Sequence, residues 1–159
     1  MRVGIANNGG FNIPKIVVIY DSISGNTEKL SQAIAEGARE VPGMEADLIN
    51  AEEIKPEEIA EADAFAFGSP SHFSIMSGKI LTMFTNLYPL RHKIAEKPAC
   101  VVTAGCGGQV TVLDNIDKVL GLFNPRFVKP GVVVEGTPKE FDIEQAKKLG
   151  KKLAEAIEK

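Results

Sequence analysis

Short apolar runs rich in β-branched residues alternate along this chain with stretches of helical periodicity, and this alternation constrains the fold more than any other feature. The run "KIVVIY", for example, is apolar almost throughout, which is typical of a parallel strand covered on both faces. The stretch after it repeats apolar residues every three or four positions, as one face of a helix does. The predicted strands are Lys15–Tyr20, Met44–Asn50, Ala62–Gly68, Ala99–Gly105 and Gly131–Gly136. The predicted helices are Thr27–Arg39, Pro56–Glu61, Gly78–Pro89, Thr111–Phe123 and a last one with Asp142 as its N-cap.

Strands that alternate with helices form a parallel sheet covered by helices on both faces, because the crossovers are right-handed and pack back onto the sheet. The predicted fold class is therefore α/β, a three-layer sandwich with a five-stranded parallel sheet. The length of 159 residues suits a single domain, 1–159, in which residues 1–14 form an N-terminal extension or a short extra strand. Ligands bind such sheets at the carboxyl ends of the strands, so the loops after the first, third and fourth predicted strands are candidate sites.

Charge and composition exclude several classes of partner. The formal net charge of −3, without a basic stripe, argues against a nucleic-acid-binding protein. No apolar run reaches the length of a membrane span and no stretch resembles a secretion signal, so we expect a cytoplasmic protein without membrane insertion. Cys100 and Cys106 suggest no disulfide framework, and no metal ligands are predicted.

The loop after the first predicted strand, "DSISGNTEKL", has the composition of a phosphate-binding loop. Hydroxyl and amide groups come from Ser22, Ser24, Asn26 and Thr27, Gly25 permits a tight turn, and the following helix offers its positive end. A loop that positions a transferable phosphate would carry a Gly-Lys-Ser/Thr sequence, which is absent here. The sequence therefore favours a phosphate that is held as an anchor. The alternative is a polar loop with an ordinary N-cap.

Three segments of the chain resemble one protein family. "SISGNT" (Ser22–Thr27) resembles the phosphate loop of flavodoxin-like FMN proteins. "GSPSHFSIMSGK" (Gly68–Lys79) and "TAGCGGQ" (Thr103–Gln109) are similar to the isoalloxazine loop and the Gly-Gly-Gln segment of the Trp-repressor-binding-protein type NAD(P)H:quinone oxidoreductases. The resemblance covers most of the chain from Lys15 onward. It implies a flavodoxin-like sheet with strand order 2-1-3-4-5 and FMN as the cofactor.

The resemblance also implies roles for individual residues. The phosphate of FMN would be held by Ser22, Ser24, Gly25, Asn26 and Thr27. The isoalloxazine ring would be lined by Ser69, Pro70, Ser71, His72 and Phe73, with Thr103, Ala104, Gly105 and Gly107 along its far edge. His72 is the candidate catalytic residue, since its imidazole would place positive charge near the reduced flavin. The alternatives are that His72 is a plain loop residue and that Phe73 is a lid over the core.

The function that the resemblance implies is an oxidoreductase that passes a hydride from NAD(P)H through FMN to a quinone or another small electron acceptor. A homo-oligomer, either a dimer or a tetramer, is implied as well. The main alternative is an electron-transfer flavodoxin, although a net charge of −3 is modest for a carrier steered by charge. A third possibility is an enzyme without flavin that uses Cys106 as a nucleophile at a strand–turn–helix junction.

Overall fold

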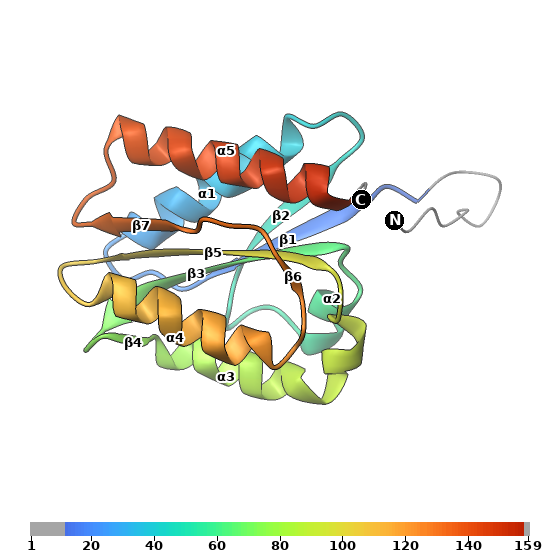
Figure 1. The fold of residues 1–159 in the computed structure, drawn as a ribbon, viewed down its shortest axis with the longest axis horizontal. Coiled ribbons are helices and arrows are strands. Elements are labelled where there is room, and N and C mark those ends of the chain that lie inside the picture. Colours follow the sequence, from blue (N-terminus) through green and yellow to red (C-terminus); the bar gives the residue numbers. More distant parts are fainter. Residues whose placement is uncertain (1–11, 158–159) are drawn as a thin grey trace.

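The computed structural model describes residues 12–157, in which a mainly parallel sheet lies between two layers of helices (Figure 1). The described strands are β1 (Lys15–Tyr20), β2 (Glu45–Asn50), β3 (Ala64–His72), β4 (Ile75–Met76), β5 (Pro98–Gly105), β6 (Arg126–Phe127) and β7 (Val132–Glu135). The described helices are α1 (Asn26–Arg39), α2 (Pro56–Ala60), α3 (Gly78–Leu87), the 3₁₀ helix η1 (Tyr88–Lys93), α4 (Gln109–Gly121) and α5 (Glu140–Ile157). α1 and α5 cover one face of the sheet, and α3 and α4 cover the other (Figure 1). The predicted three-layer α/β sandwich is confirmed.

The strands of the sheet follow the predicted order 2-1-3-4-5, with β5 and β7 as the predicted fourth and fifth strands. β2 and β3 flank β1, and β5 lies beyond β3, all in parallel register. Two short strands were not predicted. β4 pairs antiparallel with β3, and β6 pairs with β5 beside β7 on the same edge.

The edge of the sheet beyond β5 is interrupted. Pairing with β5 stops after Phe127 and resumes at Val132, and residues 128–131 between them lie outside the ladder. Between these two paired regions the edge segment contains more residues than β5 does, so the segment bulges. Pro130, within the bulge, has no N–H to donate to a neighbouring strand. The edge beyond β5 therefore consists of two pieces, and only the second, β7, coincides with the predicted strand Gly131–Gly136.

One apolar cluster on each face of the sheet holds the layers together. Successive side chains of a strand point to opposite faces, so Ile16 and Val18 pack under α1 and α5, whereas Val17 and Ile19 face α3 and α4. All four side chains are buried, and each contributes about 1.5–3 kcal/mol to folding. Burial on both faces is the reason that "KIVVIY" is apolar almost throughout.

Two glycines allow α1 and α5 to approach each other closely. A Cβ atom on Gly37 of α1 would overlap the backbone carbonyl of Lys147, and one on Gly150 of α5 would overlap that of Ile34. Each helix thus presents a glycine to the backbone of the other. A side chain at either position would force the helices apart.

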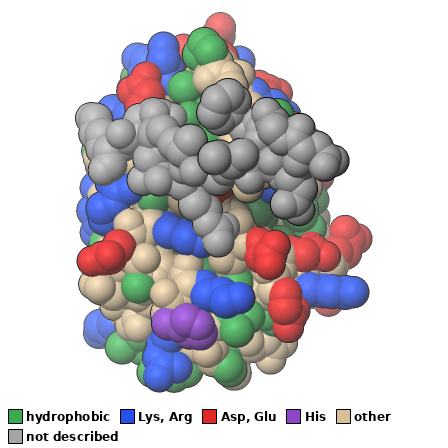
Figure 2. Space-filling model, turned by 90° about the vertical axis from the view of Figure 1, so that its right-hand side faces the viewer, with side chains coloured by type: hydrophobic (Ala, Val, Ile, Leu, Met, Phe, Trp, Pro, Cys, Tyr) green, Lys and Arg blue, Asp and Glu red, His purple; other side chains and the backbone are tan. Residues whose placement is uncertain are grey.

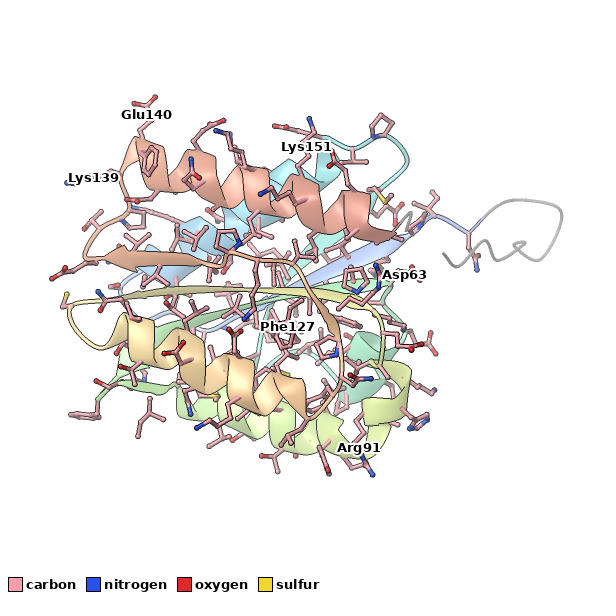
Figure 3. All side chains as sticks on the ribbon, viewed as in Figure 1. Asp63, Arg91, Phe127, Lys139, Glu140 and Lys151 are labelled. Carbon is pink, nitrogen blue, oxygen red and sulfur yellow. The ribbon has the colours of Figure 1, made fainter. Side chains whose placement is uncertain are left out.

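Several predicted helix boundaries are wrong. The last helix begins at Glu140, and Asp142 lies inside its first turn, where its carboxylate accepts a hydrogen bond from the Lys139 N–H (2.7 Å). Lys139 and Glu140 lie at the end of the molecule where α4 also begins (Figure 3). α4 itself starts at Gln109, two residues before the predicted position. α3 ends at Leu87, two residues before the predicted end at Pro89, and the chain goes on as the 3₁₀ helix η1, whose first turn accommodates this proline.

The opposite end of the molecule, where the parallel strands begin, carries charges of both signs. Figure 2 shows Lys and Arg side chains on this face interspersed with Asp and Glu side chains. Of the predicted extension 1–14, residues 1–11 lie outside the described residues. Among residues 12–157, no helix combines the length and the apolar character that crossing a membrane requires.

Candidate functional site

The loop from Ser22 to Gly25 connects β1 to α1 and leaves the start of α1 without a side-chain cap. Gly25 is the N-cap residue, and its φ of 92° is a left-handed conformation that glycine adopts without strain. Ser24 is exposed to solvent. No side chain among residues 12–157 caps the first-turn N–H groups of α1. The first-turn N–H groups of α1 are therefore available to an anion.

Hydrogen bonds hold this loop in a shape that suits a phosphate group. The hydroxyl oxygen of Ser22 accepts from the Gly25 N–H (3.1 Å), and Asn26 Nδ2 donates to the Gly136 carbonyl (3.2 Å). Thr27, at 2% exposure, lies in the first turn of α1. A Cβ atom on Gly25 would meet nothing within 4 Å, so the space beside the turn is open. Hydroxyls, backbone amides and a helix N-terminus bind phosphate without a cation, so the residues present fit the phosphate of FMN.

The second predicted segment is a β-hairpin, not a loop. β3 continues beyond Gly68 because β5 pairs with it as far as Pro70 and β4 pairs with it after that. Four predicted ring contacts therefore lie in a strand: Ser69, Pro70, Ser71 and His72. Phe73 and Ser74 form the turn, with φ values of 56° and 63°. Phe73 is 99% exposed, so the alternative that it is a lid over the core is wrong.

The side chain of Ser69 stabilises this hairpin through two hydrogen bonds. It is fully buried, and its hydroxyl oxygen accepts a hydrogen bond from the Ser77 N–H (2.9 Å). The same hydroxyl donates to the carbonyl of Pro70 (2.8 Å). Since the Ser69 side chain is buried and its O–H is already donated to Pro70, a flavin contact at Ser69 would come from its backbone. The side chains of Ser71 and His72 are partly exposed.

The third predicted segment, the loop after β5, lies against the hairpin. The Ser71 hydroxyl donates to the carbonyl of Gly107 (2.7 Å), and a Cβ atom on Gly108 would overlap the side chain of Ser74. The Gly136 N–H donates to the carbonyl of Gly105 (2.9 Å). Because Gly136 also accepts from the phosphate loop, hydrogen bonds connect all three predicted segments at the carboxyl edge of the sheet.

Two of the predicted far-edge residues are inside the sheet. Thr103 and Ala104 are buried in β5, and the Thr103 hydroxyl donates to the carbonyl of Gln109 (2.9 Å). Gly105 ends β5, and Gly107 lies in the loop. Gln109 Oε1 is buried and has no hydrogen-bond partner among residues 12–157. A buried acceptor of this kind is suited to an N–H donor of a bound ligand.

A recess of about 630 Å³ opens beside the phosphate loop. It is lined by Asp21, Ile23, Ala51, Glu52, Ile54, Pro56, Ile59, His72, Gly78, Lys79, Thr82, Met83 and Asn86. The Lys79 ammonium is 2.9 Å from the carboxylate of Glu52 and 3.9 Å from that of Asp21. The hydrogen bond that the Lys79 ammonium donates to Glu52, together with the charges of both carboxylates, raises the pKa of Lys79. Because His72 and Ile23 both line this recess, His72 shares a cavity with the phosphate loop.

The two cysteines differ in exposure. Cys100 is buried in β5, and burial raises the pKa of its thiol. Cys106 is exposed in the loop after β5. Among residues 12–157, no group of three or more His, Cys, Asp or Glu side chains is placed to hold a metal ion.

Comparison with known proteins assigns the chain to a family. The sequence profile of the family described as Flavodoxin matches residues 18–82. A protein of Aquifex aeolicus named "Flavodoxin" is 32% identical, over 90% of this chain and 86% of the relative. The chain belongs to the flavodoxin family. An Archaeoglobus fulgidus relative of this flavodoxin-family protein, named "NAD(P)H dehydrogenase (quinone)", is 30% identical over 91% of the chain and 98% of the relative.

Solved structures share the fold. A flavodoxin from the domain Archaea superposes with a TM-score of 0.84 at 22% identity, over 91% of this chain and 99% of the other. The rubredoxin oxygen:oxidoreductase of Desulfovibrio gigas gives a TM-score of 0.81 at 23% identity, over 91% of this chain and 36% of the other. FMN, predicted from the sequence, is confirmed as the cofactor of this flavodoxin-family protein. The individual contact residues stay predictions.

Sequence reasoning missed three residues of this flavodoxin-family site. No role was predicted for Asp21, Glu52 or Lys79. A carboxylate directly after a buried strand was the one available signal for Asp21. Glu52 and Lys79 lie 27 residues apart in the sequence and carry no local pattern, so only the folded chain brings them together.

Proposed function

We propose that this flavodoxin-family protein is a single-domain, FMN-dependent NAD(P)H:quinone oxidoreductase. The observation that carries the proposal is the position of His72, which lines the same recess as Asp21 and Ile23 of the phosphate loop. An ionisable imidazole beside the cofactor site suits an enzyme that must stabilise developing charge, whereas a pure electron carrier has no need of one. Relatives named "NAD(P)H dehydrogenase (quinone)" at 27–31% identity support the same activity.

Each group of site residues would have its own role. The phosphate of FMN would be held by Ser22, Ser24, Gly25, Asn26 and Thr27. When bound, FMN supplies the redox chemistry, accepting a hydride from NAD(P)H and returning two electrons to a quinone. His72 would hold positive charge close to the ring, and Phe73 would offer an aromatic face to a planar partner. The loop with Gly105 and Gly107 would close the far edge.

We also propose a compartment, a partner and an oligomeric state for the protein. We place it in the cytoplasm, with a quinone or another small electron acceptor as its partner. A dimer or tetramer would cover Phe73, which is 99% exposed and costs free energy to leave in water.

His72→Ala should slow the reduction of the bound cofactor by NADH or NADPH about tenfold or more, with a much smaller change in FMN affinity. The imidazole acts on charge that develops during the reaction, so its loss affects the rate before it affects binding. The rate is measured anaerobically from the loss of visible flavin absorbance, and FMN affinity is measured by titration of the apoprotein. His92→Ala is the matched control, because His92 is exposed in η1 at the other end of the molecule.

A carrier flavodoxin is the second candidate, and the relative named "Flavodoxin" at 32% identity favours it. The same titration separates the two functions. An oxidoreductase loses its flavin absorbance with one of the nicotinamides and regains it when a quinone is added. A protein that reacts with neither NADH nor NADPH, while accepting electrons from a chemical reductant, would be a carrier.

Cys106→Ser should keep its FMN and most of its nicotinamide-driven quinone reduction. A nucleophilic cysteine needs a base within reach. The only candidate imidazole at the carboxyl edge of the sheet is that of His72, which lines the recess beside the proposed cofactor site. Turnover and flavin content are measured on the same preparation. Loss of turnover with flavin content intact would show that the thiol takes part in the reaction. Alkylation of the wild-type protein is a companion experiment that modifies Cys106 alone, because Cys100 is buried and its thiol pKa is raised.

A further inference from the structure

The outer edge of β7 is open, because β7 pairs with β5 and with no other strand of residues 12–157. Just after β7, the Gly136 N–H donates to the carbonyl of the last residue of β5 (2.9 Å). Successive residues of a strand direct their backbone N–H and C=O groups to opposite sides, so those of Val134 also face β5. The N–H and C=O groups of Val133 and Glu135 therefore point away from the sheet, where a further strand would pair with them.

A groove borders this edge on each face of the sheet, since β7 runs between α4 and α5 (Figure 1). The groove on the α4 side has a volume of about 480 Å³ and the one on the α5 side about 250 Å³, and both reach Pro130 and Gly131. Each contains a phenylalanine that solvent reaches: Phe127 (37% exposed) on the α4 side and Phe141 (71% exposed) on the α5 side. An added strand directs alternate side chains to the two faces, so each groove would receive every second side chain.

The groove on the α5 side is basic. Lys148 and Lys152 line it one helical turn apart, and neither forms an ion pair within residues 12–157. Asp142 is the acidic residue of this groove, and its carboxylate already accepts the Lys139 N–H (2.7 Å). Two uncompensated ammonium groups beside an open strand edge favour acidic side chains at alternate positions of the strand that pairs with it.

The groove on the α4 side disfavours acidic side chains. The Lys129 ammonium contacts the carboxylate of Asp117 (2.7 Å), so the charge of Asp114 leaves this groove negative. Leu113 and Val128 give the groove an apolar surface. The side chains that enter on this face should therefore be apolar.

We propose that the β7 edge binds an extended peptide segment of another protein in which acidic and apolar residues alternate. The backbone of the segment pairs with the outward N–H and C=O groups of Val133 and Glu135. Its acidic side chains contact Lys148 and Lys152, and its apolar side chains enter the groove on the α4 side. This surface contains none of the residues predicted to hold FMN, and the proposal does not rest on the oxidoreductase activity.

The test uses the full-length, FMN-loaded protein and a rhodamine-labelled peptide, Thr-Val-Glu-Val-Glu-Val-Thr. We expect saturable binding by fluorescence anisotropy, with amide NMR shifts concentrated at residues 131–135 and along the side of α5 that faces the groove. The same peptide with lysine in place of glutamate is the matched control. It should bind at least about tenfold more weakly, because its ammonium groups would meet Lys148 and Lys152.

Charge reversal on the protein tests the basic groove. Lys148→Glu combined with Lys152→Glu should reverse the preference, so that the lysine peptide binds better than the glutamate peptide. Lys55→Glu combined with Lys93→Glu changes the net charge equally, but neither residue lines a groove at this edge. This control should bind the glutamate peptide as wild type does. FMN content and circular dichroism show that each variant is folded.

Two changes test the backbone pairing. Val133→Pro removes the outward N–H at a position where an edge strand tolerates proline, and it should weaken binding about tenfold or more. N-methylation of two adjacent central residues of the peptide places a methyl group on both edges of the added strand. Against the wild-type protein this peptide should lose affinity to a similar extent, and the result does not depend on how any variant folds.

Absence of saturable binding, or equal affinity for the glutamate and lysine peptides, would overturn the proposal. Unchanged affinity after N-methylation would overturn it as well, because the backbone of the peptide would then be unpaired. Concentration-dependent dimerisation of the wild-type protein that Val133→Pro abolishes would also contradict it, since a second copy of the chain would then occupy the edge.

Discussion

Ser24→Ala combined with Thr27→Ala should release FMN from a protein that remains folded. Each hydrogen bond to a charged phosphate is worth about 1.5–3 kcal/mol, so the loss of two should weaken binding by about a hundredfold or more. The start of α1 has no side-chain cap that could compensate, because Gly25 occupies the N-cap position. The affinity of the apoprotein for FMN, measured by flavin fluorescence, gives the result.

Conservative substitutions provide the control for this experiment. Thr27→Ser keeps a hydroxyl and should hold FMN almost as well as wild type. Thr85→Ala removes a threonine hydroxyl from α3, where it donates to the Leu81 carbonyl, and should leave FMN affinity unchanged. Wild-type affinity in the double variant would mean that the phosphate is held elsewhere.

Gly37→Ala and Gly150→Ala should each destabilise the protein by about 3 kcal/mol. The added methyl group would overlap a backbone carbonyl, of Lys147 or Ile34 respectively, and a backbone cannot move aside as a flexible side chain can. Alanine favours a helix over glycine by about 1 kcal/mol, so the measured loss is what remains after that gain. Urea unfolding followed by circular dichroism gives the free energy of unfolding.

Gly121→Ala is the matched substitution for this pair. Gly121 is also helical, at the end of α4, and a Cβ atom there would meet nothing within 4 Å. We expect this variant to be as stable as wild type or slightly more stable. If Gly37→Ala behaved like Gly121→Ala, the close approach of α1 and α5 would be refuted.

The hairpin between β3 and β4 shows where sequence reasoning stopped. A two-residue turn with both φ values positive is normally marked by Asn-Gly or Asp-Gly, and here it is Phe73–Ser74. The turn therefore had no recognisable signal, and "GSPSHFS" was read as a loop. β3 runs on to His72 because β5 and then β4 supply pairing partners, which are contacts between segments distant in the sequence or across the turn.

Local patterns were enough for the five main strands, most helices and the fold class, and they predicted a phosphate loop. Apolar runs, helical periodicity and a cluster of hydroxyl residues at a strand–helix junction each act within a few residues, so a sequence displays them directly. Tertiary structure alone decided the divided edge strand, the contact of Gly37 and Gly150 with opposite backbones, and the Asp21, Glu52 and Lys79 group. These features depend on distances between residues far apart in the chain, and such distances exist only once the sheet has assembled and the helices have packed on it.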